Sequence, residues 1–406
     1  MAENRLNVTS EVGILRKVLV HRPGPELQNL VPRYLEDLLF DEIPWLERAQ
    51  EEHDGFVQLM RHEGVEVYYL EDLVTELVED ERLRQELVQQ QLKFSPLAGN
   101  SEQLRVMQEY LNSLPPREMV DTLIAGVRKA AISHLKNRVT LGDLIKDSFP
   151  FALGPLPSFY FTRDHGTMIG EKLMISMMFN FARRRETVFL RFVERHHPLF
   201  QSVSPVFEEE LPVGLEGGDV LVLSPDTLAI GLSQRTSEAA IEAAADWLLA
   251  ETQLVDRILV ISIPPKRAYM HLDTVFTMVD RDQFLIYPGI EDSIEVYRLE
   301  RDGNGRVTAS SEPDLVSALK SALRLPAVNL IRSGGDDPIT AAREQWCDST
   351  NTVALAPGKV ITYNRTQVTN RVLRKAGIEV LEIEGSELVR GRGGPHCMTL
   401  PLLRED

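Results

Sequence analysis

The stretch GRGGPHCMTLP near the C-terminus contains Cys397, one of two cysteines among 406 residues. A thiolate is a strong nucleophile, and a catalytic cysteine needs a nearby group that can give and take protons. His396 is its neighbour, but adjacent side chains on an extended chain point in opposite directions. The second cysteine, Cys347 in QWCDST, is expected to be a small buried apolar residue. Cys397 is therefore the candidate nucleophile, and its partners are expected elsewhere in the chain.

Candidate partners lie just before four predicted strand pairs, in the stretches FTRD, LEGGD, MHLD and CDSTN. These stretches are Phe161–Asp164, Leu215–Asp219, Met270–Asp273 and Cys347–Asn351. The side chains in them that could act with a thiol are Asp164, Glu216, Asp219, His271 and Asp273. If equivalent positions of a repeated unit converge on one axis, these side chains meet Cys397 there.

Each of these residues, taken alone, has a simpler explanation. Asp164 and Asp219 are typical of turns and caps, where a carboxylate accepts hydrogen bonds from backbone N–H groups. The EGGD stretch is consistent with a tight turn in which Gly217 and Gly218 supply unusual backbone angles. A single His271 is more often a buried core histidine than a catalyst. The functional interpretation therefore depends on the whole set.

The set suits a cationic substrate. His271 and Asp273 are two residues apart on a predicted strand and would share one face. A guanidinium group is planar, permanently charged and matches carboxylates through paired hydrogen bonds. Two acids could hold it while a thiolate attacks its central carbon and a histidine protonates the departing ammonia. Because carboxylates raise the pKa of a thiol and a bound cation lowers it, we expect Cys397 to be protonated when the site is empty.

Repeated strand pairs must position these residues. The pairs are predicted in Thr167–Met178, Asp219–Leu232, Thr274–Gly289 and Thr352–Asn364. Each has apolar runs around a turn rich in Gly, Asp, Pro or Lys, and three are followed by a helix-like stretch. A fifth unit could pair ILRKVLVHRPG with the C-terminal strand around CMTLP. Such repeats favour a radial array of about five units over an ordinary α/β sheet, which remains the alternative.

A different pattern occupies the region from Asp72 to Asp147. The stretches DLVTELVEDERLRQELVQQQL, EQLRVMQEYLNSL and REMVDTLIAGVRKAAISHL carry apolar residues at helical spacing. Glycine is scarce there, and no alternating strand pattern is present. We therefore predict an inserted helical bundle domain over 72–147 and a catalytic α/β domain made of 1–71 and 148–406.

Composition narrows the classes of function. A net charge of −17 argues against a nucleic-acid partner, and 43% hydrophobic residues is typical of a soluble globular protein. The start MAENRLNVTSEVG lacks the features of a signal peptide, and no apolar stretch is long enough to span a bilayer. Two cysteines cannot form a disulfide framework or a Cys-rich zinc site. We expect a cytoplasmic protein with no membrane partner.

Six motifs carry a resemblance to a known family: FTRD, RRRET, LEGGDVL, SQRT, HLDTVF and RGGPHCM. In this order and spacing they closely resemble the arginine deiminases, members of the guanidino-group-modifying superfamily. The resemblance covers essentially the whole chain and implies a five-bladed pseudosymmetric α/β propeller of the pentein type, with a helical insertion. It implies hydrolysis of L-arginine to L-citrulline and ammonia through a covalent amidino-cysteine intermediate, in arginine catabolism. It also implies that no metal or organic cofactor is needed and that the protein forms a homo-oligomer.

The resemblance implies a role for each catalytic candidate. Cys397 would be the nucleophile and His271 the general acid–base. Glu216 would orient and polarise the imidazole. Asp164 and Asp273 would hold the guanidinium of the substrate.

The resemblance also implies residues for the other end of the substrate. Arg183, Arg235 and Arg392 would bind its carboxylate, since a free carboxylate needs cationic partners. Phe161 would pack along its aliphatic stem. The remaining residues implied on the substrate side are Asp219, Gly391 and Ser158.

Ser158 is a departure from the family pattern. The family usually has PNxxFTRD, whereas this chain has PLPSFYFTRD, with Ser158 in place of the asparagine. The asparagine helps to hold the amino-acid end of the substrate. A serine keeps a donor and an acceptor but is shorter, so a water could bridge the gap. Affinity or selectivity is therefore expected to differ from the family pattern.

Alternatives stay open at this point. The same fold could act on agmatine or a methylated arginine, or transfer the amidino group to an amine. Three arginines suited to a carboxylate argue against agmatine, and the helical insertion argues against the shorter methylarginine hydrolases. A non-catalytic arginine sensor would not need a nucleophile. A metal-dependent hydrolase would leave Cys397 without a role, and its ligands could be His271, Asp273, Asp164, Glu216 and Asp219.

Overall fold

Five sheets repeat one pairing plan, in which two antiparallel strands are joined by a third strand parallel to one of them. The computed structural model describes residues 5–95, 101–135, 149–207 and 213–406. Within these ranges the strands form six sheets, and the five that share the plan have the orders β19-β1-β2, β5-β6-β7, β14-β13-β10-β9-β8, β11-β12-β15 and β16-β17-β18. The chain is thus a mixed α/β protein built from similar units.

The four predicted strand pairs are confirmed as antiparallel hairpins. They are β5 (Gly166–Ile169) with β6 (Lys172–Ile175), β8 (Val220–Ser224) with β9 (Thr227–Leu232), β11 (Phe276–Met278) with β12 (Gln283–Ile286), and β16 (Val353–Ala356) with β17 (Lys359–Tyr363). The turn between β16 and β17 contains Gly358, whose φ of 73° is one that residues with a side chain rarely adopt.

The predicted fifth pairing is also confirmed. β1 (Ile14–Val20) runs antiparallel to the C-terminal strand β19 (Leu400–Glu405) and parallel to β2 (Glu66–Tyr69). The corresponding third strands of the other units are β7 (Ser204–Pro205), β10 (Arg257–Ser262), β15 (Asn329–Arg332) and β18 (Glu379–Ile383). The first and last segments of the sequence therefore complete one unit together.

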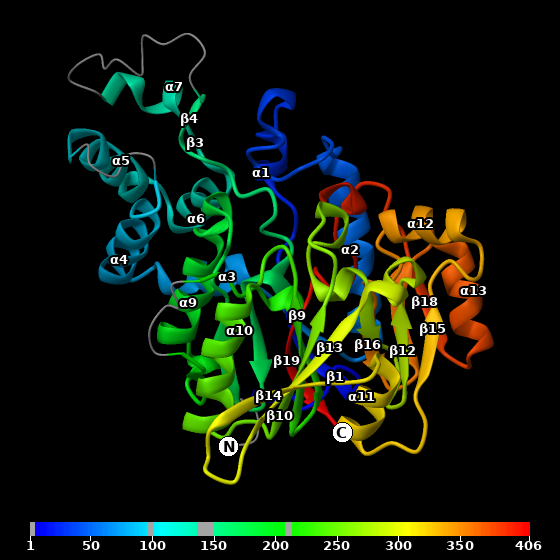
Figure 1. Cartoon of the computed structure of the whole chain (residues 1–406). Helices are drawn as coiled ribbons and strands as arrows, with labels where there is room; N and C mark the ends of the chain where they lie inside the picture. The colour runs from blue at the N-terminus through cyan, green and yellow to red at the C-terminus, as the bar shows by residue number, and fades with distance from the viewer. Residues whose placement is uncertain (1–4, 96–100, 136–148, 208–212) are drawn as a thin grey trace.

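Helices connect the hairpins to their third strands. These connections contain α2 (Leu46–His62), α9 (Glu186–His196), α10 (Glu238–Ala245), α11 (Leu315–Leu323) and α13 (Gln367–Lys375). Figure 1 shows α9 and α10 on one side of the molecule and α12 (Pro338–Trp346) and α13 on the other, with sheets between them. Strand β8 is buried from Val220 to Leu223, as expected of a strand covered on both faces.

Further elements complete the units. A π-helix (Asp246–Glu251) continues α10, and the strands β13 (Glu295–Arg301) and β14 (Val307–Ser311) extend the sheet of β10. The short helix α1 (Pro25–Gln28) follows β1. Among the residues that the structure describes, no helix is both long and apolar enough to cross a membrane.

The predicted helical region contains four successive helices. They are α3 (Leu70–Leu77), α4 (Glu81–Leu92), α5 (Ser101–Ser113) and α6 (Pro116–Ala125). The side chain of Asp80 caps α4 by accepting hydrogen bonds from two backbone N–H groups of its first turn. Helix α3 already begins at Leu70, and the end of the predicted region lies outside the described residues.

The helical pattern predicted beyond Ala125 is wrong in part. The chain forms the short strand β3 (Val127–Arg128), which pairs with β4 (Phe151–Leu153), before the short helix α7 (Lys129–Ile132). Gly126 ends α6 with a φ of 84°, and a Cβ there would lie 2.6 Å from the carbonyl oxygen of Leu153. Gly126 therefore turns the chain sharply where the apolar spacing alone suggested a continuous helix.

Candidate active site

Three short 3-10 helices carry the acidic candidates to one place. They are Thr162–His165, Gly217–Asp219 and Leu272–Thr274, and each leads into the first strand of a hairpin. His271 lies just before the third of these helices in an extended conformation, so the expected strand carrying both His271 and Asp273 is not present. A 3-10 turn sends successive side chains in different directions, and these two side chains have different partners.

Positions 217 and 218 of the EGGD stretch have no room for a side chain, so both must be glycine. Neither Gly217 nor Gly218 has a positive φ, so the expectation of unusual backbone angles is wrong for both residues. A Cβ at Gly217 would lie 2.1 Å from the carbonyl oxygen of Arg163, and one at Gly218 would lie 2.7 Å from Nδ1 of His271. The two glycines therefore let the neighbouring units approach each other closely enough to bring Glu216 to His271.

His271 is held between two carboxylates and is almost fully buried. Its Nε2 lies 2.7 Å from Oε2 of Glu216, and its Nδ1 lies 3.5 Å from Oδ1 of Asp164. Burial lowers the pKa of His271, but Asp164, Glu216 and Asp219 together outweigh burial and raise the pKa to about 9. The imidazole is therefore protonated near neutral pH, which suits a general acid.

Glu216 carries the complementary charge. Burial raises its pKa, but the hydrogen bond from His271 and the charge of Arg235 lower it more, to about 2. Its Oε1 accepts a hydrogen bond from the backbone N–H of Phe179 at 2.9 Å. Glu216 is therefore a fixed anion that orients the imidazole ring.

Asp164 and Asp273 each have one hydrogen-bonded oxygen and one oxygen without a hydrogen bond in the described ranges, although Oδ1 of Asp164 also lies 3.5 Å from His271. Oδ2 of Asp164 accepts from Nη1 of Arg183 at 2.7 Å, and Oδ2 of Asp273 lies 2.8 Å from Nδ1 of His396. The Oδ1 atoms of both residues are buried and have no hydrogen-bond partner among the described residues. Such acceptors cost about 1–3 kcal/mol each when left unpaired, so both favour a ligand that donates hydrogen bonds.

The thiol of Cys397 lies beside one of these carboxylates. Its Sγ is 3.4 Å from Oδ2 of Asp273 and 3.1 Å from Nδ2 of Asn351. Burial raises the pKa of this thiol well above its ordinary value, and the charges of Asp273, Asp164 and Asp348 raise it further. This direction agrees with the expectation of a protonated thiol in the empty site.

Asn351 holds the loop of Cys397 and was missed as a candidate. Its Oδ1 accepts the backbone N–H groups of Gly394 and Cys397, each at 2.9 Å. The backbone N–H of Gly394 is therefore engaged by a side chain of the neighbouring unit. Asn351 precedes β16 as Asp164 precedes β5, so the repeat itself was a signal that could have identified it.

His396 belongs to a second buried network. Its Nδ1 binds Asp273, and its Nε2 lies 3.1 Å from Oε2 of Glu11. Glu11 also accepts from both terminal nitrogens of Arg163, at 3.3 and 3.2 Å. Glu11 and Arg163 are residues of this network that the motif analysis did not single out.

Asp219 is fully engaged by protein donors. Its Oδ1 accepts from the backbone N–H of Leu272 at 2.8 Å, and its Oδ2 accepts from the hydroxyls of Ser233 and Thr236, both at 2.7 Å. Burial raises its pKa to about 7 against the opposing effects of His271 and these donors. Asp219 thus joins the units of β8 and β11, as expected of a structural acid.

Arg183 is bound by two carboxylates. Besides Asp164, it contacts Glu186 through Nε at 3.0 Å and Nη2 at 2.8 Å. Glu186 in turn lies 3.3 Å from Nε2 of the buried His165. In this arrangement Arg183 neutralises part of the acidic site, and a substrate carboxylate would have to compete with these partners.

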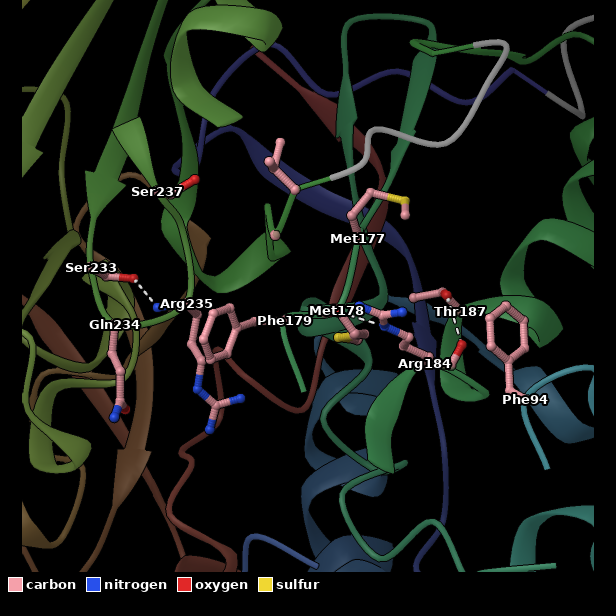
Figure 2. A pocket seen from close by; sticks show the side chains of 12 residues that line it. Phe94, Met177, Met178, Phe179, Arg184, Thr187, Ser233, Gln234, Arg235 and Ser237 are labelled. Carbon is pink, nitrogen blue, oxygen red and sulfur yellow. Dashed lines mark hydrogen bonds between the residues drawn. The ribbon is translucent and has the colours of Figure 1, made fainter. Parts of the chain in front are cut away.

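Arg235 lines a cavity of about 550 Å³ on the outer side of Glu216. Its Nη1 is 3.6 Å from Oε2 of Glu216 and has no hydrogen-bond partner among the described residues. Figure 2 shows Arg235 beside Phe179 on one wall, with Arg184 and Phe94 across the cavity. This cavity could hold the part of a substrate that lies beyond the guanidinium.

Arg392 lies in a different cavity, of about 190 Å³. Its guanidinium stacks 3.5 Å from the centre of the Trp346 ring, and its φ of 66° is unusual for a residue with a side chain. Its Nε and Nη1 have no hydrogen-bond partner in the described part of the chain. The three arginines expected to bind one carboxylate therefore have three different environments.

Phe161 and Gly391 pack together behind the thiol loop. Phe161 lies 4.1 Å from Tyr160 between ring centres, and a Cβ at Gly391 would lie 2.0 Å from the Tyr160 hydroxyl. Ser158 is buried, and its carbonyl oxygen accepts the backbone N–H of Phe161 at 3.0 Å. The close packing explains why position 391 holds glycine.

Three of the site residues could also coordinate a metal ion. Asp164, Glu216 and His271 each offer one ligand atom, and these atoms lie within 4.8 Å of one another. The guanidinium groups of Arg183 and Arg235 lie against two of these carboxylates and would repel a dication. The donor set therefore fits an organic cation that donates to the Oδ1 atoms of Asp164 and Asp273 better than it fits a metal ion.

Comparison with known proteins decides the family. The sequence profile of the arginine deiminase family matches residues 36–404. The chain belongs to the arginine deiminase family. An arginine deiminase of Listeria welshimeri serovar 6b is 44% identical over 409 residues, with 100% of both chains covered. An arginine deiminase of Streptococcus agalactiae serotype V is 42% identical over 403 residues, covering 99% of this chain and 98% of that protein. The resemblance inferred from the six motifs is confirmed.

Solved structures of more distant proteins share the fold with this arginine deiminase family member. SxtG, an amidinotransferase from Microseira wollei in the saxitoxin biosynthetic pathway, has a TM-score of 0.57 at 14% identity, covering 99% of this chain and 98% of its own. The N-terminal domain of ArgZ, a cyanobacterial arginine dihydrolase, has a TM-score of 0.54 at 15% identity, covering 96% and 98%. The mixed α/β fold is therefore that of the pentein proteins.

Proposed function

We propose that this protein hydrolyses L-arginine to L-citrulline and ammonia through a covalent intermediate on Cys397. One observation carries the proposal. The buried Oδ1 atoms of Asp164 and Asp273 lack hydrogen-bond partners among the described residues, and the thiol lies beside Asp273. A guanidinium would supply donors to both carboxylates and bring its central carbon to the sulfur. Membership of the arginine deiminase family supports the same substrate.

Binding of the cation prepares the nucleophile. In the free site the pKa of the Cys397 thiol is raised, mainly by burial. A guanidinium between Asp164 and Asp273 offsets their charges, so the pKa of the thiol falls, its proton passes to water and the thiolate forms. The amino-acid end of the substrate extends toward Arg183, Arg235 and Arg392. Arg235 and Arg392 have N–H groups without partners among the described residues, whereas Arg183 is already bound to Asp164 and Glu186. Phe161, Gly391 and Ser158 are proposed to line the rest of the substrate, and Asp219, whose two oxygens are engaged by protein donors, is proposed to support the site as a structural acid.

The first half of the reaction releases ammonia. The Cys397 thiolate attacks the central carbon of the guanidinium and forms a carbon–sulfur bond. His271 begins protonated, because its pKa is about 9, and it donates its proton to the departing amino group. The carbon–nitrogen bond breaks, ammonia leaves, and an amidino-thioether remains on Cys397. Glu216 stabilises the charge of the imidazole throughout.

The second half of the reaction hydrolyses the thioether. His271 is now neutral and can accept a proton from a water molecule, which attacks the same carbon. The carbon–sulfur bond breaks, L-citrulline leaves, and the sulfur and the imidazole regain their starting protonation. The cycle uses only groups of the chain, the substrate and one water.

We also propose the domain architecture and the oligomeric state. The five similar units support a five-bladed pentein propeller with catalytic residues at one end of its axis. Helices α3 to α6 support an inserted helical bundle domain over 72–147, between catalytic parts 1–71 and 148–406. We also propose a cytoplasmic homo-oligomer active in arginine catabolism. Light scattering during size-exclusion chromatography would measure the oligomeric state.

The substrate is tested with purified protein in the presence of EDTA. Equimolar citrulline and ammonia from L-arginine, with little product from agmatine or methylated arginines, would support the proposal. Turnover of agmatine instead would assign a different guanidino substrate, for which Ser158 is the first residue to examine. Activity that disappears in EDTA and returns with a divalent cation would favour the metal-dependent alternative at Asp164, Glu216 and His271.

A further inference from the structure

Arg185 is a buried cation whose hydrogen-bond acceptors, within the described ranges of the chain, are all uncharged. It is 4% exposed, and burial lowers its pKa to about 9 against the opposing charge of Glu186. Its Nε donates to Oε1 of Gln91 at 3.0 Å, its Nη1 donates to the carbonyl oxygen of Gly154 at 2.6 Å, and its Nη2 donates to that of Leu123. An apolar side chain is often buried at lower free-energy cost than a charged one. Packing alone therefore does not explain why a guanidinium is buried at this position.

Two of these acceptors lie at the ends of helices in the helical segment α3–α6. Gln91 is in the last turn of α4, and Leu123 is in the last turn of α6. The carbonyl of Leu123 is one of the last of its helix, and such groups lack partners within the helix and carry partial negative charge, so it suits a cation, whereas Gln91 accepts through its side-chain oxygen. Gln91 also donates from Nε2 to the main-chain oxygen of Arg185 at 3.2 Å. The helical segment therefore holds both the side chain and the backbone of Arg185.

The residues on either side of Arg185 support the guanidinium site. Arg183 donates to Oδ2 of Asp164 at 2.7 Å and also binds Glu186. The free Oδ1 of Asp164 is the atom that the substrate would meet, and its direction depends on the bond made by Oδ2. The backbone that places Arg183 and Glu186 passes through Arg185, so the contacts of Arg185 set the position of both.

We infer that Arg185 and Gln91 are positioning residues through which the helical segment fixes the Arg183–Asp164 pair. This inference rests on the proposed function, because Asp164 is taken to bind the guanidinium of the substrate. It gives helices α4 and α6 a part in substrate affinity even though neither supplies a residue that touches the substrate.

The test measures binding without turnover. In a Cys397→Ala background, the dissociation constant of L-arginine is determined by calorimetry. Gln91→Leu keeps the size of the side chain but removes its donor and acceptor, and it should weaken binding roughly tenfold. Arg185→Lys keeps the charge but cannot reach all three acceptors, and it should have a similar effect. Gln89→Leu, on the exposed face of the same helix, is the matched control and should leave the constant unchanged.

A double-mutant cycle separates positioning from general structural support. Gln91→Leu is combined with Arg183→Gln, which removes the pair that Gln91 is inferred to position. The effect of Gln91→Leu on the dissociation constant should then fall below about twofold, since coupled residues are not additive. Additive effects, or a lower thermal unfolding midpoint with an unchanged dissociation constant, would overturn the inference.

The two proposals fail in different ways. If Arg185→Lys does not fold, Gln91→Leu carries the test by itself. Citrulline formation by the wild-type protein, together with wild-type affinity in Gln91→Leu and Arg185→Lys, would overturn only the positioning role. Absence of both citrulline formation and L-arginine binding would overturn the proposed function and this inference with it.

Discussion

The side-chain amide of Asn351 contacts Cys397 at two points, with Nδ2 3.1 Å from Sγ and Oδ1 2.9 Å from the backbone nitrogen. Nδ2 also donates to the carbonyl oxygen of Asp273 at 3.1 Å. One uncharged side chain thus sets the position of the nucleophile relative to a carboxylate proposed to hold the substrate. A group that orients reacting atoms in this way can contribute as much to the rate as a group that reacts.

Asn351→Leu should lower kcat/KM about a hundredfold, because a displaced thiol no longer meets the guanidinium carbon. The variant is close to asparagine in size and removes only the hydrogen bonds. Steady-state kinetics with L-arginine measures the effect. Asn304→Leu, in an exposed turn, serves as the control. Activity within threefold of wild type in Asn351→Leu would show that the loop holds Cys397 without the amide.

Asn351→Asp should act differently. The carboxylate still accepts the backbone N–H groups of the loop, but it places a further negative charge beside Sγ. The pKa of the thiol should therefore rise further than in the wild-type protein. The pH dependence of alkylation by iodoacetamide measures this shift, and an unchanged profile would argue against contact between this side chain and the sulfur.

Glu216→Gln should lower the pKa of His271 from about 9, since it removes a carboxylate that favours the charged imidazole. A pKa raised on folding stabilises the protein fully below the unfolded value of about 6.5, and this contribution is lost as the pH rises through about 9. The whole shift corresponds to on the order of 3 kcal/mol, and Asp164 and Asp219 supply part of it, so wild-type protein should exceed Glu216→Gln in stability by less than this amount near pH 6 and by still less near pH 9. Urea unfolding across this range measures the difference. A difference that does not change with pH would remove the evidence for a protonated His271.

Free Cys397 should react slowly with iodoacetamide at neutral pH, because burial and the nearby carboxylates raise the pKa of its thiol. Guanidinium ion should increase the thiolate fraction, since a cation between Asp164 and Asp273 lowers that pKa. Ultraviolet absorbance of the thiolate measures the change, with Cys397→Ser as the blank and tetramethylammonium as a cation without donors. A thiol with a pKa near 7 in the free protein would contradict the proposed order of events.

Local patterns in the sequence predicted much of this structure. Alternating apolar runs around turn residues predicted four hairpins, because a hairpin is specified by neighbouring residues. The repeat of those hairpins placed acidic residues before their first strands, and the structure brings Asp164, Glu216 and His271 together there. The contact between the two ends of the chain, β1 with β19, followed from the same repeat.

Features that depend on distant contacts could not be predicted in this way. Position 217 must be glycine because a side chain there would collide with the carbonyl oxygen of Arg163. Arg163 lies 54 positions earlier in the chain, so no local pattern reveals this contact. Two partners of Arg185, Gln91 and Leu123, come from the helical segment, 94 and 62 positions earlier in the chain. The turn at Gly126 was missed because apolar spacing resembles a helix on both sides of it.

Gly217→Ala should disrupt the site, because the added methyl group would lie 2.1 Å from the backbone oxygen of Arg163. The 3-10 helix must then move, and the distance between Glu216 and His271 should grow. We expect destabilisation of about 1–3 kcal/mol from the overpacked contact, with loss of most activity. Thermal unfolding and kinetics measure both effects.

A matched glycine substitution separates this steric effect from a general sensitivity to alanine. Gly55 lies in α2 with no atom within 4 Å of a built Cβ. Gly55→Ala should stabilise the protein by about 0.5–1 kcal/mol, because alanine favours a helix over glycine. Equal changes in stability for Gly217→Ala and Gly55→Ala would contradict the close contact between Gly217 and Arg163.

The most direct test of the central claim is the mass of Cys397 during turnover. Wild-type protein is mixed with excess L-arginine, quenched in acid, digested and analysed by mass spectrometry. The peptide containing Cys397 should gain the mass of arginine less ammonia, and the peptide containing Cys347 should not. An unmodified Cys397 peptide at every time point, while citrulline accumulates at the wild-type rate, would contradict covalent catalysis by this residue.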